Sequence, residues 1–449
     1  MHQKDTISAI STAPGNGAIS IVRLSGKDAI LIADSIFSKD VKKFKSHSSH
    51  VGKIIDDKKN VVDQAIIVVY LTPNSFTGED IVEIQCHGGS LITQRVFETT
   101  IKAGAKIAEA GEFTLRAFLN KKIDLIQAEA IQDLISAKNK FALESAKNHL
   151  EGYLSNEIKS FQKEIIDITA IIEASMDFTE EDLEFENANE LLNKVQKILK
   201  DMQKLSNTFE NGKIFKNGLS LCIIGGVNVG KSSLMNAILK KERAIVTKIA
   251  GTTRDVIKED IKLNEMFYQL IDTAGIRKTN NLIEKEGIKR SRDHFKKADL
   301  TLLVLDSNKN LDEEDFDLLK EMDENRTIVI WNKIDLKKPS QKIDAKNIAH
   351  ISAKKRLGLD DLYQMIKNLT FKSNFLNDDI IITKKRHQVA LENSIMYLKK
   401  AAQGLKDNTT YEFIAADLKS SLLNLSKIIG FDITDDILTS IFSNFCIGK

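Results

Sequence analysis

The chain has 449 residues, of which 42% are hydrophobic and 29% are charged. This composition is typical of a soluble globular protein with two or three domains, and it excludes a disordered chain. The 65 basic and 63 acidic residues give a formal net charge of only +2, so the global charge does not indicate nucleic-acid binding.

Neither a membrane span nor a secreted protein is expected. No apolar run approaches the roughly 20 residues that a spanning helix needs, and the amino terminus, MHQKDTISAI, lacks the basic and apolar regions of a signal peptide. Cys86, Cys222 and Cys446 are too far apart for a cysteine-rich zinc site or a disulfide framework. We therefore expect a cytoplasmic protein.

Residues 1–118 are expected to form a mixed α+β domain. The β-branched runs AISIVRLSG, QAIIVVYLT and DIVEIQCHGG end in turn residues, which predicts three strands. The segment SLITQRVFETTIKAG has helical periodicity and a glycine where the helix would end.

Residues 119–216 and 376–449 are expected to form the two parts of one helical domain. A long helix is predicted by apolar residues that recur at spacings of four and three: Leu154, Ile158, Phe161, Ile165, Ile168 and Ile172. A second amphipathic helix is predicted by Leu192, Val195, Leu199, Met202 and Leu205. Helix packing explains these stripes better than a cofactor site does.

Residues 217–375 are expected to form an α/β domain inserted into the helical one. The runs LSLCIIGG, FYQLIDTAG, DLTLLVLD, RTIVIWNK and AHISAKK have the composition of buried strands, and segments of helix length separate them. This alternation predicts a parallel sheet covered on both faces, with a ligand at the carboxyl ends of its strands.

A phosphate-binding loop is predicted at residues 225–232, GGVNVGKS, which match G-x-x-x-x-G-K-S between a strand and a helix. Lys231 would bridge the β- and γ-phosphates, and Ser232 would bind Mg²⁺. A chance glycine-rich turn is the weaker alternative, because the strand and helix flank the loop. The predicted nucleotide contacts of this segment are Asn228, Val229, Gly230, Lys231, Ser232 and Ser233.

Two later segments are predicted to reach the γ-phosphate. In TKIAGTTRD a threonine hydroxyl can complete the Mg²⁺ shell, and spacing does not choose between Thr252 and Thr253. In DTAG, Asp272 would support the metal and the Gly275 N–H would contact the γ-phosphate. The predicted nucleotide contacts here are Thr247, Lys248, Ile249, Ala250, Gly251, Thr252, Thr253, Asp272, Thr273, Ala274 and Gly275.

The sequence NKID predicts that the base is guanine. The Asp335 carboxylate can accept two hydrogen bonds from the ring N–H and the exocyclic amine, a donor pair that adenine lacks. Asn332 and Lys333 complete this motif, and Ser352, Ala353 and Lys354 can offer backbone N–H groups to the guanine oxygen. The motifs occur in GTPase order, so the sequence predicts a GTP-binding domain.

The residue after DTAG is Ile276, where many nucleotide hydrolases have a glutamine that orients water. Arg254 and Arg277 are candidates to supply positive charge to the transition state. Alternatively, the amide oxygen of Asn228 can bind a monovalent cation together with backbone carbonyls of residues 247–252.

For the water itself, Glu284 and Glu286 are candidates, although from the residues alone each is better explained as a solvated helix glutamate.

The whole chain resembles the MnmE (TrmE) family of bacterial tRNA-modification GTPases. Besides the GTP motifs, it has the segments NSFTGED, HGGS, GEFTLRAFLNKKIDLIQAEAI and the terminal FCIGK. The FTGED and CIGK segments are more specific to the family than any GTP motif. The resemblance implies a multidomain fold: an α+β folate-binding domain, an α-helical domain and an inserted α/β P-loop GTPase domain.

The resemblance also implies potassium-stimulated hydrolysis of GTP by a homodimer whose GTPase domains meet across the nucleotides. The implied K⁺ ligands are Asn228, Thr247, Ile249 and Thr252. Thr253 becomes the Mg²⁺ threonine and Glu284 orients the water indirectly. With Lys231, these two are the implied catalytic residues.

For residues 1–118 the resemblance implies dimerisation and binding of 5,10-methylenetetrahydrofolate or 5-formyltetrahydrofolate through Arg23, Glu83, Lys122 and Lys449. Arg23 or Lys122 suits the folate carboxylates, and Glu83 suits the donor edge of the pterin. The role of Cys446 stays open.

The implied partner is the FAD-containing MnmG, in a heterotetramer that modifies carbon 5 of the wobble uridine of tRNA. Two other functions remain: a regulatory GTPase, such as a ribosome-assembly switch, and a scaffold that binds GTP without turnover.

Overall fold

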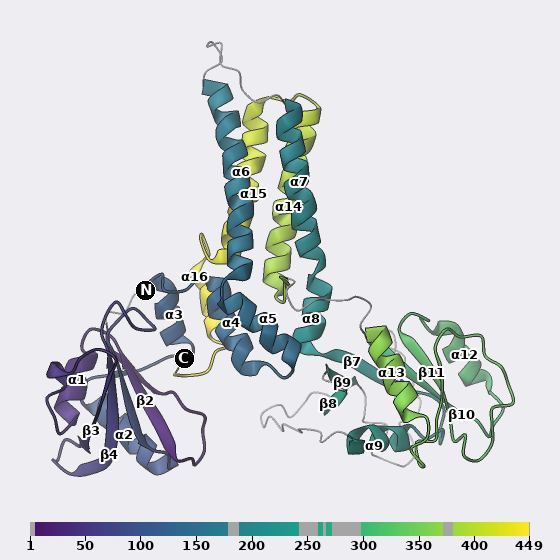
Figure 1. The fold of residues 1–449 in the computed structure, drawn as a ribbon, viewed down its shortest axis with the longest axis horizontal. Coiled ribbons are helices and arrows are strands. Elements are labelled where there is room, and N and C mark those ends of the chain that lie inside the picture. The colour runs from purple at the N-terminus through teal and green to yellow at the C-terminus, as the bar shows by residue number, and fades with distance from the viewer. Residues whose placement is uncertain are drawn as a thin grey trace. The chain divides into compact units, whose positions relative to one another are not determined.

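The computed structural model describes residues 5–177, 188–241, 259–263, 266–271, 298–370 and 380–448 (Figure 1). The chain divides into two compact units. One contains residues 1–136, 146–206 and 385–449, and the other contains residues 137–145 and 207–384. Segments distant in sequence therefore fold together within each unit.

The amino-terminal sheet has the strand order β3-β4-β5-β2-β1-β6. Its strands are β1 (Ile7–Ile10), β2 (Ile19–Ser25), β3 (Ser48–Ile55), β4 (Val61–Tyr70), β5 (Ile81–His87) and β6 (Lys106–Ile107). All neighbours are antiparallel except β1 and β6. Strands β2, β4 and β5 confirm the three predicted strands.

Helices α1 (Ala29–Ile36) and α2 (Ser90–Lys102) pack on this sheet, and a short 3₁₀ helix spans Val41–Lys43. Their shared core contains Val22, Leu24, Ile36, Ile67, Ile84 and Val96. The helix predicted from SLITQRVFETTIKAG is α2, which ends at Lys102 because Gly104 follows with a φ of 112°.

The same unit contains α3 (Glu112–Leu119), α4 (Leu125–Ser136), α6 (Tyr153–Asp177), α7 (Ala188–Asn207), α14 (Lys385–Lys406), α15 (Tyr411–Ile429) and α16 (Asp435–Phe442). Helix α15 packs against both α6 and α14 (Figure 1). Helix α5 (Lys140–Leu150) has residues in both units.

The long apolar stripe predicted for α6 is confirmed, because all six of its residues are buried. On α7 the prediction was wrong at two positions. Leu191 and Ile198 are buried there, whereas Leu192 and Leu199 are only partly buried. A shift of one residue turns a side chain by about 100° around the helix, which places these two leucines at the border of the stripe.

The second unit contains a sheet of order β12-β11-β10-β7-β9-β8. Its strands are β7 (Leu219–Ile224), β8 (Glu259–Leu263), β9 (Met266–Ile271), β10 (Leu300–Asp306), β11 (Thr327–Asn332) and β12 (Ile348–His350). All pairs are parallel except β8 and β9. The five predicted strands and the parallel sheet are confirmed, whereas β8 was not predicted.

Both faces of this sheet are covered. Leu221 and Leu302 belong to one apolar cluster, and Cys222 and Leu303, the next residues along their strands, belong to another. Successive side chains of a strand point to opposite faces, so the clusters lie on the two sides. Among the described residues, this unit also contains α8 (Phe209–Asn217), α9 (Lys231–Lys241), α12 (Glu313–Glu321) and α13 (Leu359–Thr370).

Within the described residues, no helix combines the length and the apolar character required to span a bilayer.

Candidate functional site

The predicted phosphate loop connects β7 to α9 and has an unusual backbone. Gly225 and Gly230 have φ angles of 147° and 100°, and Asn228 has a φ of 62°. A side chain at Gly225 would collide with the Val304 carbonyl oxygen, and one at Gly230 would collide with the Asn332 side chain. Glycine is therefore required twice, because the loop lies directly on the carboxyl ends of β10 and β11.

Lys231, the first residue of α9, is folded back onto this loop. Its Nζ donates hydrogen bonds of 2.7 Å to the Gly225 oxygen and 2.6 Å to the Gly226 oxygen. Burial lowers the pKa of Lys231, while the acidic residues Glu314 and Asp315 act in the opposite direction. The structure thus places the ammonium group at the loop in which we predict phosphate binding.

Ser232 and Ser233 occupy the first turn of α9 and are exposed. A hydroxyl at this position, next to free N–H groups of the helix terminus, suits an oxygen ligand for Mg²⁺ and contacts to phosphate.

Asn332 connects the phosphate loop to the loop that carries Ser352, Ala353 and Lys354. Its Nδ2 donates to the Val229 oxygen at 2.9 Å, and its Oδ1 accepts from the Ala353 N–H at 3.0 Å. Both bonds are buried, so this side chain fixes the distance between the two loops. The sequence identified Asn332 as a member of the NKID motif but did not predict this bridging role.

Lys333 makes a second connection to the phosphate loop. Its Nζ donates to the backbone oxygen of Asn228 and to Asp306 Oδ2, both at 2.7 Å. Burial opposes ionisation of Asp306, but hydrogen bonds from Lys333 and Asn308 outweigh it and hold the pKa of this carboxyl below its usual range. Asp306 was not predicted from the sequence, although an acid at the carboxyl end of a buried strand is a signal for this edge of the sheet.

Asp335 lies close to the loop that carries Ser352, Ala353 and Lys354. Its side chain is 8% exposed, with one oxygen 3.9 Å from Lys355 Nζ. The preceding residue, Ile334, donates its N–H to the Ile351 oxygen at 3.2 Å, which ties the NKID segment to the chain before Ser352. Ser352 and Ala353 are buried, whereas Lys354 is exposed. The structure therefore brings together the predicted guanine contacts.

The other predicted nucleotide, metal and catalytic residues lie outside the described residues. They are Thr247, Lys248, Ile249, Ala250, Gly251, Thr252, Thr253, Asp272, Thr273, Ala274, Gly275 and Glu284, together with the alternatives Arg254, Arg277 and Glu286.

Two of the predicted folate contacts are paired with each other in the amino-terminal sheet. Arg23 on β2 lies opposite Glu83 on β5, and its Nε and Nη2 donate to Glu83 Oε1 at 2.9 and 2.7 Å. The guanidinium carbon is 5.8 Å from the centre of the Phe113 ring. Burial raises the pKa of Tyr70, and the Glu83 carboxylate raises it further, while Arg23 acts in the opposite direction.

The carboxyl-terminal segment reaches the same pair. The Gly448 oxygen accepts from Ser11 Oγ at 3.1 Å and from Arg23 Nη1 at 3.5 Å. The Gly111 N–H donates to the Cys446 oxygen at 3.4 Å, and the Cys446 side chain is exposed. Lys449 lies outside the described residues. The tail is thus bonded to the start of the chain next to the Arg23–Glu83 pair.

Lys122 belongs to a different set of contacts. Its Nζ donates to the Pro73 oxygen at 2.9 Å, in the loop that precedes the FTGED segment, rather than to Glu83. The structure therefore brings Arg23, Glu83 and the tail together but gives Lys122 another partner.

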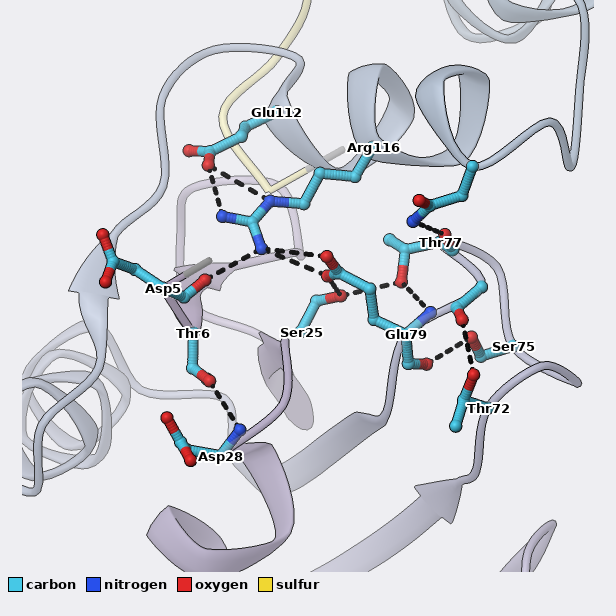
Figure 2. Close-up of polar contacts among 12 residues, drawn as sticks. Asp5, Thr6, Ser25, Asp28, Thr72, Ser75, Thr77, Glu79, Glu112 and Arg116 are labelled. Carbon is cyan, nitrogen blue, oxygen red and sulfur yellow. Dashed lines mark hydrogen bonds and ion pairs between the residues drawn. The ribbon is translucent and has the colours of Figure 1, made fainter. Parts of the chain in front are cut away.

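The FTGED and GEFTLRAF segments form a partly buried polar network around the buried Arg116 (Figure 2). Arg116 Nη2 donates to Glu112 Oε1 at 2.7 Å, and its Nη1 donates to Glu79 Oε2 at 3.1 Å and to the backbone oxygen of Asp5 at 2.9 Å. Glu79 Oε2 also accepts from Ser25 Oγ at 2.7 Å. The charged residues of these two segments therefore have a structural role. They hold the residues just before β1, helix α3 and the FTGED loop together.

The comparisons with known proteins agree with this architecture. Residues 6–122 match the family described as "GTP-binding protein TrmE N-terminus", and residues 125–446 match the "MnmE helical domain". The tRNA modification GTPase MnmE of Protochlamydia amoebophila (strain UWE25) is 48% identical over 447 residues, which cover 99% of this chain and 98% of that protein. This chain belongs to the MnmE family.

Two further MnmE proteins support this assignment. That of Thermoanaerobacter pseudethanolicus (strain ATCC 33223 / 39E) is 42% identical, with 99% of both chains covered. That of Clostridioides difficile (strain 630) is 40% identical, with 100% of both chains covered. The resemblance found in the sequence is confirmed, and it extends along the whole MnmE chain.

Proposed function

We propose that this chain is a GTP hydrolase that acts in tRNA modification. The observation that carries the proposal is the Asn332 side chain, which joins the phosphate loop to the loop of Ser352 and Ala353. This one buried residue thereby fixes the distance between the predicted phosphate contacts and the predicted base contacts, so that a single ligand can reach both. A guanine nucleotide has a phosphate end and a base with a donor pair, and it fits both.

The guanine end depends on Asp335. Its largely buried carboxylate, held by the NKID turn, can accept the two donors of guanine, and a base without them would leave this carboxylate unpaired. At the other end, Lys231 and the loop N–H groups would bind the phosphates, and Ser232 with Thr253 would bind Mg²⁺.

Hydrolysis without a glutamine at Ile276 needs another source of positive charge. Asn228 is exposed, and its backbone is fixed by Lys333, so its side chain is held at the edge of the phosphate loop. We assign it as a K⁺ ligand with Thr247, Ile249 and Thr252. A potassium ion bound there supplies charge that an arginine provides in other GTPases. Glu284 is assigned to orient the water indirectly.

Rates of GTP hydrolysis in KCl and in NaCl test this assignment. We expect at least about a tenfold higher rate in KCl, and we expect Asn228→Ala to lose that stimulation while it still binds nucleotide. Equally low rates of the wild type in both salts would contradict the potassium assignment.

A separate variant tests Glu284. Glu284→Ala should bind GTP normally and hydrolyse it at least about a hundredfold more slowly, because the water loses its orientation. Unchanged turnover would remove Glu284 from the mechanism. Glu286→Ala is the matched control, since it removes the same charge two residues later.

For the amino-terminal unit we propose binding of a one-carbon tetrahydrofolate, either the 5,10-methylene or the 5-formyl derivative. The support is the Arg23–Glu83 pair beside the carboxyl-terminal tail, which offers a cation for a folate carboxylate and a carboxylate for the pterin donors. Lys449, next in sequence to Gly448, is assigned to the same site. Lys122 requires movement away from Pro73 to join it.

The wider proposal is that the chain acts as a homodimer in a heterotetramer with the FAD-containing MnmG, in the cytoplasm. The complex would install an aminomethyl or carboxymethylaminomethyl group at C5 of the wobble uridine of certain tRNAs. Nucleoside analysis of tRNA from cells that lack this protein is the test, and we expect the modified uridine to disappear. If wobble modification persists, the pathway assignment is wrong, although GTP binding is unaffected by that result.

A further inference from the structure

Asp315, in the first turn of α12, shares a pair of capping hydrogen bonds with Asp312. The Asp312 carboxylate accepts from the Asp315 N–H at 2.9 Å, and Asp315 Oδ2 accepts from the Asp312 N–H at 3.4 Å. This reciprocal arrangement stabilises the start of the helix. It also fixes the side chain of Asp315, because one of its two oxygens is committed to the cap.

The second oxygen of Asp315 faces the phosphate loop. Oδ1 is buried and has no hydrogen-bond partner among the residues that the structure describes, and the whole residue is 8% exposed. A side-chain carbon built at Gly226 would lie 3.8 Å from this oxygen. Buried carboxyl oxygens are normally hydrogen-bonded. An oxygen that has no such bond, next to a loop that binds phosphate, has no role in the fold described above.

The same loop residue is bonded to Lys231. The Gly226 oxygen accepts from Lys231 Nζ, and both Asp315 and Glu314 favour the charged form of this lysine. In the GTP site proposed above, Lys231 has to leave the Gly225 and Gly226 oxygens to reach the phosphates. A carboxylate on the side of Gly226 opposes this movement.

We propose that Asp315 weakens nucleotide binding and accelerates nucleotide release. Its carboxylate stabilises the arrangement in which Lys231 is bonded to the loop, and it repels the phosphate groups that enter. Both effects favour the empty site, so they add. The inference rests on the proposed GTP site, and it means that a residue of α12 sets how tightly this site binds nucleotide.

Binding of a fluorescent GDP to the full chain, with Mg²⁺ and K⁺ present, tests the proposal. Asp315→Asn removes the charge but keeps the volume and an oxygen that can accept from the Asp312 N–H. We expect about tenfold tighter binding from this variant, mainly through slower dissociation. Asp317→Asn removes one charge from the exposed side of the same helix, and it should bind GDP like the wild type.

The pH dependence provides a second readout. Burial raises the pKa of Asp315; the charges of Asp312 and Glu314 act in the same direction, and Lys231 and the hydrogen bond from the Asp312 N–H act against it. The penalty exists only when Asp315 is ionised, so the affinity ratio between Asp315→Asn and the wild type should grow as pH rises through that pKa. Titration of the phosphates is common to both proteins and cancels in the ratio.

The outcomes are distinguishable. A wild type that does not bind GDP would refute the proposed function itself. Equal GDP affinities of the wild type and Asp315→Asn at every pH would overturn the role of Asp315, and so would an equal gain in Asp317→Asn. Asp315→Gln repeats the charge removal with another residue suited to this capping position, so a folding defect of the asparagine variant does not prevent the test.

Discussion

The phosphate loop and the Arg23–Glu83 site differ in the groups that form them: one is made mainly from backbone and the other from side chains. In the loop, backbone carbonyls accept hydrogen bonds from lysines of two short motifs, as in the bonds from Lys231 to Gly225 and from Lys333 to Asn228. In the amino-terminal sheet, side chains that are 60 residues apart pair across strands, and the tail completes the contacts. A site made from backbone needs glycines and a lysine at fixed spacing, whereas a site made from side chains depends on strand register.

Arg116→Ala is expected to have the largest effect, and it tests how strongly the amino-terminal unit depends on contacts between side chains. The substitution leaves Glu79 and Glu112 without their shared cation, so we expect the free energy of unfolding of the first unit to fall by about 3 to 5 kcal/mol. Denaturant unfolding measures it. Arg95→Ala, an exposed arginine of α2, is the control. An effect no larger than that of the control would show that the network around Arg116 contributes little.

Lys231→Ala should lower GTP hydrolysis by about a hundredfold or more, because a charge-assisted contact to the phosphates is lost. The unfolding of the amino-terminal unit should not change. Lys320→Ala, on the exposed side of α12, provides the control. A variant that hydrolyses GTP at nearly the wild-type rate would contradict the assignment of Lys231 to the phosphate site.

Asn332→Ala tests whether one side chain holds the phosphate loop and the loop of Ser352 and Ala353 together. The Val229 oxygen and the Ala353 N–H lose their partner, so we expect a loss of about 1 to 3 kcal/mol in the stability of the second unit. Guanine-nucleotide affinity should fall about tenfold, because the base and phosphate contacts are no longer held at one spacing. Thermal unfolding and GDP titration measure the two effects, and unchanged affinity would contradict the bridging role.

The smallest expected effect concerns Tyr70. Glu83→Gln removes a negative charge that opposes ionisation of the phenol, so the pKa of Tyr70 should fall from its raised value. An absorbance titration of the variant against the wild type measures the shift, and Tyr70→Phe identifies its signal among the tyrosines. An unchanged or raised pKa would mean that the Glu83 carboxylate does not oppose ionisation of this phenol.

Whether a feature could be predicted from the sequence depends on how far apart along the chain its interacting residues lie. The phosphate loop and the apolar stripe of α6 depend on spacing within one segment, and both were predicted. The α7 stripe was misread at Leu192 and Leu199, because neighbouring positions are both apolar and only packing chooses between them. The bonds from Lys333 to Asp306 and from Arg116 to Glu79 join distant segments, and spacing along the chain contains no information about them.

The bond between Gly448 and Ser11 has a consequence for biosynthesis. The polypeptide must be translated as far as Gly448 before Ser11, the residue after β1, acquires this bond. The strands of the amino-terminal sheet are all contributed by residues 7–107, so the sheet can assemble early and its contact with the tail forms late. A premature stop codon upstream of Gly448 would therefore remove a contact from the region that is made first.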